Sequence, residues 1–171
     1  SHWVMPEQRK TACESLLLEA GCNEKVVAHC RVVRDVALEY ARCNPLVSAE
    51  LVEKGAMLHD IGRGMSHTIQ HAQLGADLLR FLGYREAIAR IVECHTGAGL
   101  TADECTLLRL SPRDCMPQST EEKIVTHADN LIEGKKRVNM EETLIAATFL
   151  PRRIRKRMYR LSQDVELLCP S

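Results

Sequence analysis

The pattern of hydrophobic and polar positions repeats with a helical period along almost the whole chain. In residues 24–43, EKVVAHCRVVRDVALEYARC, the apolar stripe runs through Val26, Val33, Val36 and Tyr40. Apolar residues spaced three and four positions apart lie on one face of an α-helix. Convincing strand alternation does not occur, so the pattern predicts an all-α fold in a single domain.

Capping and breaking residues bound the predicted helices. A capping box pairs Thr101 with Glu104, and another pairs Ser119 with Glu122. Asn23, Ser48 and Asn139 are the other expected N-caps. We expect helices near residues 8–20, 24–43, 49–60, 68–83, 84–95, from 101, 121–134, 141–150 and 152–168.

The length of 171 residues and the absence of internal repeats predict one domain with a short appendage. We expect residues 1–5, SHWVM, to be a tag remnant, and residues 6–150 to form the domain. Residues 151–171 would be a basic C-terminal helix packed on or beside it. Its cationic face is expected to be solvated, with a phosphate-rich contact as the alternative. The cluster comprises Arg152, Arg153, Arg155, Lys156, Arg157 and Arg160.

Charge and composition disfavour two classes of partner. The 23 basic and 23 acidic residues give zero formal net charge, and aromatic residues make up 4%. Neither nucleic acid nor an anionic membrane is therefore favoured as a partner. The chain contains no apolar run of about 18 residues and no signal-peptide pattern, so we expect a soluble, cytoplasmic protein. A homodimer stays open.

The eight cysteines form no C-x-x-C pair, and several lie within helical apolar patterns. Such positions are typical of small buried hydrophobic residues. We therefore expect reduced thiols in a reducing cytoplasm, without a catalytic role. The cysteines are Cys13, Cys22, Cys30, Cys43, Cys94, Cys105, Cys115 and Cys169.

Two polar residues, His59 and Asp60, interrupt the apolar stretch GAMLHDIGRG at residues 55–64. Burying such groups without partners is costly. On a continuous helix they would point about 100° apart and reach one ion only at its edge. Four further residues lie on or beside inward helix faces: His29, His71, His95 and Asp129.

Each of these six residues alone fits a hydrogen-bonded core position or a local cap. Together, on five predicted helices, they would satisfy one another around one or two cations. Mixed histidine and aspartate ligands suit Mn, Fe, Co, Ni, Zn or Mg.

The order His29, His59–Asp60, Asp129 resembles the HD superfamily of metal-dependent phosphohydrolases, and residues 59–62 spell its HDIG subgroup name. HAQLGADLL and IVECHTGAG resemble the binuclear branch, which includes bacterial diadenosine-tetraphosphate hydrolases. Small uncharacterised HDIG proteins, many of them archaeal, share HTGAG-like and EEKIVTHADNL-like stretches. The resemblance spans about residues 24–138 and implies a helical fold around the metals.

The resemblance also implies a ligand set for one or two divalent metal ions. Asp60 would bridge the two positions. The first site would use His29, His59, Asp60 and Asp129, and the second would add His71 and His95.

The implied activity is hydrolysis of a nucleotide or another small phosphate ester by a metal-bound hydroxide. Asp60 and His67 are the candidate catalytic residues, although His67 could instead cap its loop. Arg63 stands where related sequences often carry lysine, and it cannot readily donate a proton. His127 is expected at the surface or behind the ligands. Candidate phosphate contacts are Arg63, Lys135, Lys136 and Arg137, the last three alternatively forming a solvated loop.

Two other functions stay open. A metal-filled pocket could act as a non-hydrolytic nucleotide sensor, although the complete ligand set argues against a degenerate site. A di-iron oxygenase is the second alternative, because a binuclear histidine and aspartate site also suits iron.

Overall fold

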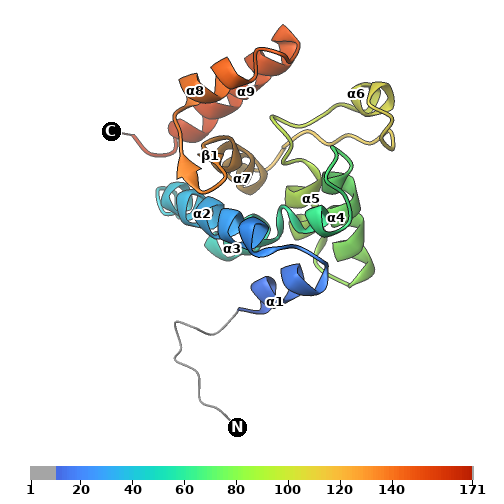
Figure 1. The fold of residues 1–171 in the computed structure, drawn as a ribbon. Helices are drawn as coiled ribbons and strands as arrows, with labels where there is room; N and C mark the ends of the chain where they lie inside the picture. Colours follow the sequence, from blue (N-terminus) through green and yellow to red (C-terminus); the bar gives the residue numbers. More distant parts are fainter. Residues whose placement is uncertain (1–10, 171) are drawn as a thin grey trace.

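The computed structural model describes residues 11–170, which form a helical assembly with a single two-stranded hairpin (Figure 1). The all-α prediction is confirmed, and the predicted tag remnant lies outside the described residues. Every helix in this part of the chain is too short or too polar to span a lipid bilayer. The elements are α1 Ala12–Glu19, α2 Glu24–Ala41, α3 Ala49–Leu58, the 3₁₀ turn η2 Ile61–Gly64, α4 His71–Phe81, α5 Glu86–Glu93, α6 Ala102–Leu107, α7 Thr120–Asn130, β1 Ile132–Glu133, β2 Lys136–Arg137, α8 Met140–Ala146 and α9 Arg152–Glu166.

The predicted N-caps begin their helices. Each cap side chain accepts a hydrogen bond from the backbone N–H three residues later, which satisfies a donor that the helix leaves free. The capping box at Thr101 is complete, whereas Glu122 accepts from Gln118 N instead of completing the box at Ser119. The caps are Asn23, Ser48, Thr101, Ser119 and Asn139.

The hairpin was not predicted. β1 and β2 pair antiparallel, with Ile132 opposite Arg137 and Glu133 opposite Lys136. Gly134 has a φ of +64°, a conformation that glycine adopts without strain, and it turns the chain between the strands. The short hairpin leaves no period-2 pattern long enough to recognise in the sequence.

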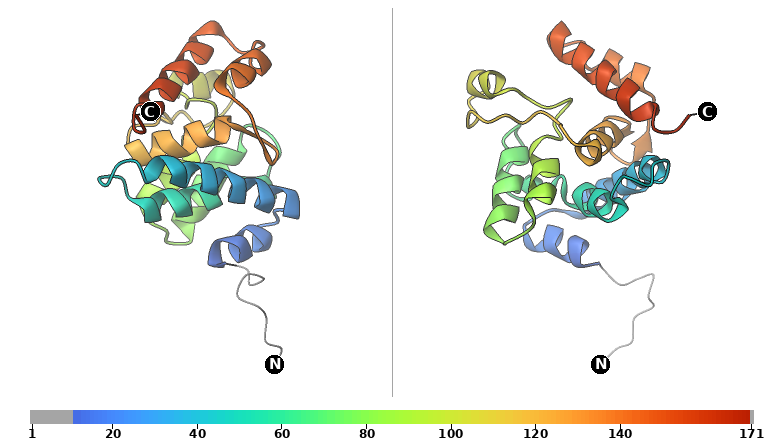
Figure 2. Two further views of the ribbon diagram at one scale, coloured as in Figure 1. Left: turned by 90° about the vertical axis from the view of Figure 1, so that its left-hand side faces the viewer. Right: turned by 180° about the vertical axis from the view of Figure 1, so that it is seen from behind.

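Two large hydrophobic clusters hold most of the helices together, and α2 contributes to both. A small third cluster contains Cys105, Leu110 and Cys115. Figures 1 and 2 show α2 and α3 side by side, with α7 against them and the α4–α5 pair beside α3. Val33, Ile124 and Met158 represent the cluster of α2, α3, α7 and α9. Leu17 and Leu79 represent the cluster of α1 to α5. The polar residues singled out above lie where these two clusters meet.

A disulfide corrects the expectation of eight reduced cysteines. Cys43 follows α2, Cys169 follows α9, and the two are joined across 126 residues of sequence. A bond between such distant residues leaves no local spacing signature in the sequence. The free cysteines are Cys13, Cys22, Cys30, Cys94, Cys105 and Cys115.

Helix α9 packs its apolar face into the core and pairs two of its arginines with α6. Ile154 and Met158 are buried in the first cluster. Arg153 Nε lies 3.1 Å from Glu104 Oε2, and Arg157 Nη1 lies 2.8 Å from Glu104 Oε1. The prediction of a solvated face therefore holds for only part of the cluster. The exposed members are Arg152, Arg153, Lys156 and Arg160.

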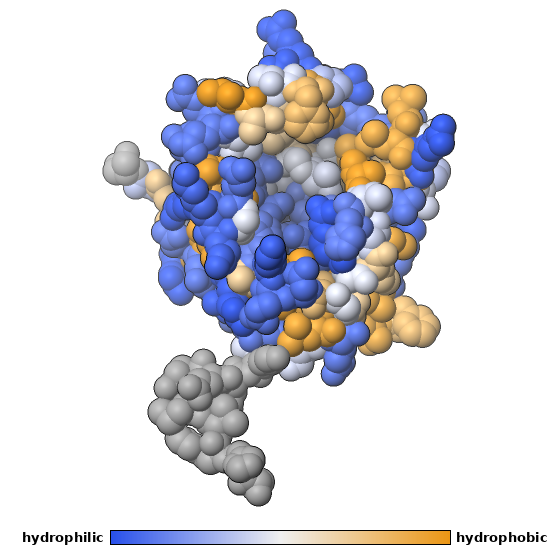
Figure 3. Space-filling view, in the orientation of Figure 1, coloured by the Kyte–Doolittle hydropathy of each residue, from blue (hydrophilic) through white to orange (hydrophobic). Residues whose placement is uncertain are grey.

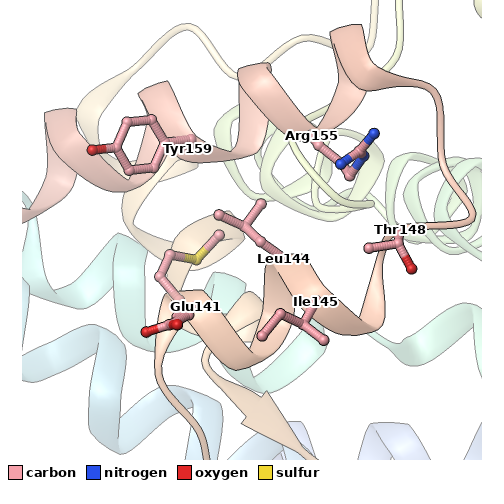
Figure 4. Close-up of a pocket in the computed structure, with 7 residues that line it drawn as sticks. Glu141, Leu144, Ile145, Thr148, Arg155 and Tyr159 are labelled. Carbon is pink, nitrogen blue, oxygen red and sulfur yellow. The ribbon is translucent and has the colours of Figure 1, made fainter.

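A groove of about 420 Å³ separates α8 from α9 (Figure 4). Leu144 points from α8 toward α9, while Tyr159 and Arg155 come from α9. Apolar surface gathers near these helices and over α6 in Figure 3, where the exposed side chains include Ile145 and Leu107. The groove shares no lining residue with the polar cluster described next.

Candidate metal centre

Six histidine and aspartate side chains meet at the junction of the two hydrophobic clusters. Their ligand atoms form overlapping groups within 4.8 Å of one another. The structure thus brings together all six residues that the sequence singled out, from five separate helices or their ends. They are His29 in α2, His59 at the end of α3, Asp60 just after it, His71 at the start of α4, His95 after α5, and Asp129 in α7.

The HDIG turn lets two neighbouring residues face one site. α3 ends at Leu58, and Asp60 leaves the helical path with φ −101° and ψ +16°. His59 and Asp60 therefore converge, with Nε2 and Oδ2 3.5 Å apart, which corrects the prediction that they would diverge. Gly62 packs against the backbone of His71, where a Cβ atom would lie 1.8 Å from the carbonyl oxygen. Glycine is required there to bring Asp60 and α4 together.

Every one of the four histidines uses Nδ1 in the same way. Each Nδ1 contacts a backbone carbonyl oxygen, which carries no proton, so Nδ1 must be the donor. The Nε2 atom is therefore free to bind a cation, in the orientation typical of metal-ligating histidines. The contacts join His29 to Gly134 O at 2.6 Å, His59 to Ala56 O at 2.6 Å, His71 to Thr68 O at 2.8 Å, and His95 to Val92 O at 2.7 Å.

Two Nε2 atoms converge on two carboxylates in the first group. His29 Nε2 lies 2.9 Å from Asp129 Oδ1, and His59 Nε2 lies 3.2 Å from the same oxygen. Asp60 Oδ2 lies 3.6 Å from His29 Nε2. The Nε2 atom of His59 is fully buried and makes no hydrogen bond of acceptable geometry. A buried acceptor facing carboxylate oxygens is satisfied by a cation between them.

Asp60 also faces the second group with its other oxygen. Its Oδ1 lies 3.3 Å from both His71 Nε2 and His95 Nε2. The two Nε2 atoms are 3.1 Å apart. Since both Nδ1 atoms donate elsewhere, two lone pairs would meet unless a proton or a metal ion intervenes. Asp60 therefore has one carboxylate oxygen for each group of ligands.

The electrostatics of the cluster favour a bound positive charge. Burial opposes charge on His59, yet Asp60 and Asp129 raise the pKa of His59 well above its usual value. Burial alone would raise the pKa of Asp60, but His59, His71 and His95 hold it well below its usual range. The pKa of Asp129 is likewise lowered, despite burial, mainly by His59. The carboxylates thus stay ionised, and the donor set fits a divalent cation.

One side of the cluster opens to a hollow of about 310 Å³. Arg63 lies on its wall, with Nε 4.0 Å from Asp60 Oδ1 and Nη1 donating to His67 O at 2.8 Å. His67 lies in the loop before α4, which begins at His71 rather than at residue 68 as expected. The hollow is lined by Asn23, Lys25, Val26, His29, Asp60, Arg63 and His67.

One basic residue that the sequence analysis did not assign to the site lines it, and one that it did assign is paired elsewhere. Lys25 lines the hollow one helical turn before His29, and its (i, i+4) spacing was the signal that could have revealed it. Arg137 instead pairs with Glu39, with Nη1 and Oε2 3.0 Å apart. Lys135 and Lys136 are exposed beside the hairpin turn. Asn130, also unassigned, donates to Gly97 O at 2.6 Å and so steadies the loop after His95.

His127 is buried and faces away from the ligand groups, so the structure excludes the surface position, one of the two that the sequence analysis allowed. Its Nε2 lies 2.9 Å from Glu166 Oε1 of α9, and Tyr40 also donates to that carboxylate. Burial lowers the pKa of His127. This residue therefore connects α7 to α9.

Comparisons with known proteins identify similar chains in archaea. An uncharacterized protein of Methanocaldococcus jannaschii is 46% identical over 132 residues, which cover 75% of this chain and 78% of that protein. A tRNA (cytidine(56)-2'-O)-methyltransferase of Picrophilus torridus is 39% identical over 132 residues. That match covers 77% of this chain but only 38% of the methyltransferase, so this chain corresponds to a minor part of it.

A solved structure shares the fold of this chain, and a family model matches its sequence. The HD domain of L. monocytogenes phosphodiesterase PgpH, in complex with cyclic-di-AMP, superposes with a TM-score of 0.58 at 15% identity. The superposition covers 92% of this chain and 95% of that one, and it supports the fold. The family model described as HD domain matches residues 26–134, which include all six residues of the polar cluster. The chain belongs to the HD domain family.

Proposed function

We propose that the chain is a metal-dependent phosphohydrolase that cleaves a nucleotide or another small phosphate ester with two neighbouring divalent cations. The observation that carries the proposal is the convergence of four Nε2 atoms on the two oxygens of Asp60 and on Asp129. Such an arrangement supports the binding of cations close enough to share one carboxylate.

The proposed ligands divide between two positions. Asp60 serves both, through Oδ2 toward the first and Oδ1 toward the second. Metal ions held by these residues would supply a hydroxide near neutral pH and offset charge on phosphoryl oxygens. The first position takes His29, His59 and Asp129, and the second takes His71 and His95.

The hollow beside the metal centre supports a place for the substrate phosphate. Lys25 and Arg63 supply positive charge on its wall, and His67 can donate a proton to the leaving oxygen there. Lys135 and Lys136 follow Gly134, whose carbonyl contacts His29, so they can contact a longer substrate. Arg137 has no such role in this proposal, because Glu39 holds it.

A nucleotide with a phosphoric diester or anhydride bond is the proposed substrate class. The complex of the PgpH HD domain with cyclic-di-AMP supports a nucleotide on this fold. The methyltransferase name of the P. torridus relative belongs to a protein of which this chain matches 38%. A convergent set of histidine and aspartate ligands supports hydrolysis at metal ions rather than methyl transfer.

The test is product release from nucleotides, cyclic dinucleotides and dinucleotide polyphosphates, with Mn²⁺, Fe²⁺, Co²⁺, Ni²⁺, Zn²⁺ or Mg²⁺ added in turn. A phosphatase is coupled in for diester products, and metal is counted in the same samples. We expect Asp60→Asn to lower turnover at least about a hundredfold, because it weakens both metal positions. Arg137→Ala is the matched control and should keep its activity.

Two results would contradict the proposal. One is a metal-loaded chain without turnover on any member of the panel, which would favour a nucleotide sensor. The other is substrate-dependent oxygen uptake by the iron form, which would favour an oxygenase.

A further inference from the structure

A cysteine lies against the first metal position. Cys30 follows His29 directly in α2, and its side chain is fully buried in the cluster that contains Val27 and Leu58. Its Sγ, a ring nitrogen of His59 and a carboxylate oxygen of Asp60 all lie within 4.8 Å of one another. The chain therefore offers a third group of potential ligands, which contains a soft sulfur atom, beside the two groups described above.

His59, the histidine of this group, has one ring nitrogen without a hydrogen-bond partner. Nδ1 of His59 donates to Ala56 O, and the buried Nε2 has no hydrogen-bond partner. Only Nε2 is thus available to a cation, whichever set of neighbours binds it. Cys30 and Asp129 belong to two groups that share His59, and they offer it one soft and one hard co-ligand.

A sulfur ligand changes which metal ions such a position prefers to bind. Carboxylate and imidazole ligands suit Mn²⁺ and Fe²⁺, whereas a thiolate selects thiophilic ions such as Zn²⁺ and Cd²⁺. In a tetrahedral site the sulfur and nitrogen ligands lie about 3.6 Å apart, so a spacing of up to 4.8 Å requires a shift on the order of 1 Å.

We infer that Cys30, His59 and Asp60 form a binding site for soft divalent cations, which overlaps the first metal position and excludes a hard ion from it. On binding, a sulfur–metal bond forms, and the thiol proton passes to solvent. The inference rests on the metal centre of the proposed function and not on its substrate. Soft cations would accordingly act as inhibitors that compete with the activating metal.

The test titrates Cd²⁺ into the metal-stripped full chain and follows the ultraviolet charge-transfer absorbance of a cadmium–thiolate bond. We expect this band to saturate at about one equivalent and to recede when excess Mn²⁺ is added. Cys30→Ser and Cys30→Ala should lose the band and bind Cd²⁺ at least about tenfold more weakly. Cys105→Ala, which removes a buried thiol in a separate cluster, should keep it.

The Mn²⁺ affinity of the Cys30 variants distinguishes loss of the sulfur ligand from loss of the fold. The Cys30 variants should bind Mn²⁺ as the unaltered chain does, because every nitrogen and oxygen ligand is present. A cadmium–thiolate band of equal strength in both Cys30 variants, or one that Mn²⁺ does not displace, would overturn this inference and leave the proposed function standing. Failure of the unaltered chain to bind either Mn²⁺ or Cd²⁺ would overturn the metal centre itself.

Discussion

Replacement of Glu104 by glutamine tests how firmly α6 is held to α9. The carboxylate accepts hydrogen bonds from Arg153 and Arg157 and from the backbone N–H of Thr101. Arg157 also donates to Gly99 O, in the loop that follows the ligand-bearing end of α5. Glutamine keeps the shape of the side chain but removes its charge, so Glu104→Gln isolates the electrostatic part of this contact.

The magnitude follows from the pKa of the carboxyl group. The hydrogen bond from Arg157, with help from Thr101 and Arg153, lowers the pKa of Glu104 from 4.5 to about 2. A difference of about 2.5 pH units corresponds to about 3.4 kcal/mol of stabilisation. The side chain of Arg153 is 60% exposed, so solvent screens part of the interaction, and we expect a loss of about 2 kcal/mol.

The direction of the pKa change determines how the stabilisation from Glu104 varies with pH. Folding lowers the pKa of Glu104, so the stabilisation is present above the ordinary pKa and is lost as pH falls toward 2. About 40% of the charge contribution should remain near pH 3. The difference in stability between the unaltered chain and the variant should therefore shrink in acid.

Urea denaturation at several pH values measures this difference. Glu141→Gln is the matched control, because Glu141 is an exposed glutamate at the start of α8. We expect the control to change the free energy of unfolding by less than about 0.5 kcal/mol. A Glu104→Gln effect below that limit at pH 7, or one that grows as pH falls, would refute the argument.

Four further results are expected. His71→Ala should lower bound Mn²⁺ from about two ions to about one, counted after dialysis, because it removes a ligand of the second position only. Replacing Cys43 and Cys169 by serine should lower stability to urea by about 3 kcal/mol, within the limit of about 5 kcal/mol set by closing a 126-residue loop, and an unchanged midpoint would contradict this. Arg63→Ala should raise KM for a phosphate ester at least about tenfold, whereas Arg137→Ala should not. Despite burial, the facing carboxylates raise the pKa of the first-site histidines, so Mn²⁺ affinity should rise with pH through neutrality, with proton release measurable by calorimetry.

The sequence predicted those parts of the fold that local interactions determine. Helix starts such as those at Asn23 and Ser48 depend on one side chain and a backbone N–H three residues away. The six polar residues were recognisable because they interrupt apolar stripes, where an unpartnered group is costly. His29 is the clearest example, since it lies among buried residues of α2.

The parts that escaped prediction depend on residues far apart in the chain. The Cys43–Cys169 bond, the Arg137–Glu39 pair and the burial of His127 against α9 require the assembled fold. The orientation of the Asp60 side chain was not predicted, for a different reason. A departure from helical dihedral angles at a single residue leaves no periodic trace in the sequence.

The backbone contacts of the four histidines have a consequence for the divergence of this site. The groups that fix the ligand orientation are carbonyl oxygens, in three cases those of the residue three positions earlier. Substituting the side chains of those residues leaves the acceptors in place. The arrangement of the ligands can therefore persist while the lining of the hollow changes, so that what the hollow accommodates can diverge around an unchanged set of ligands.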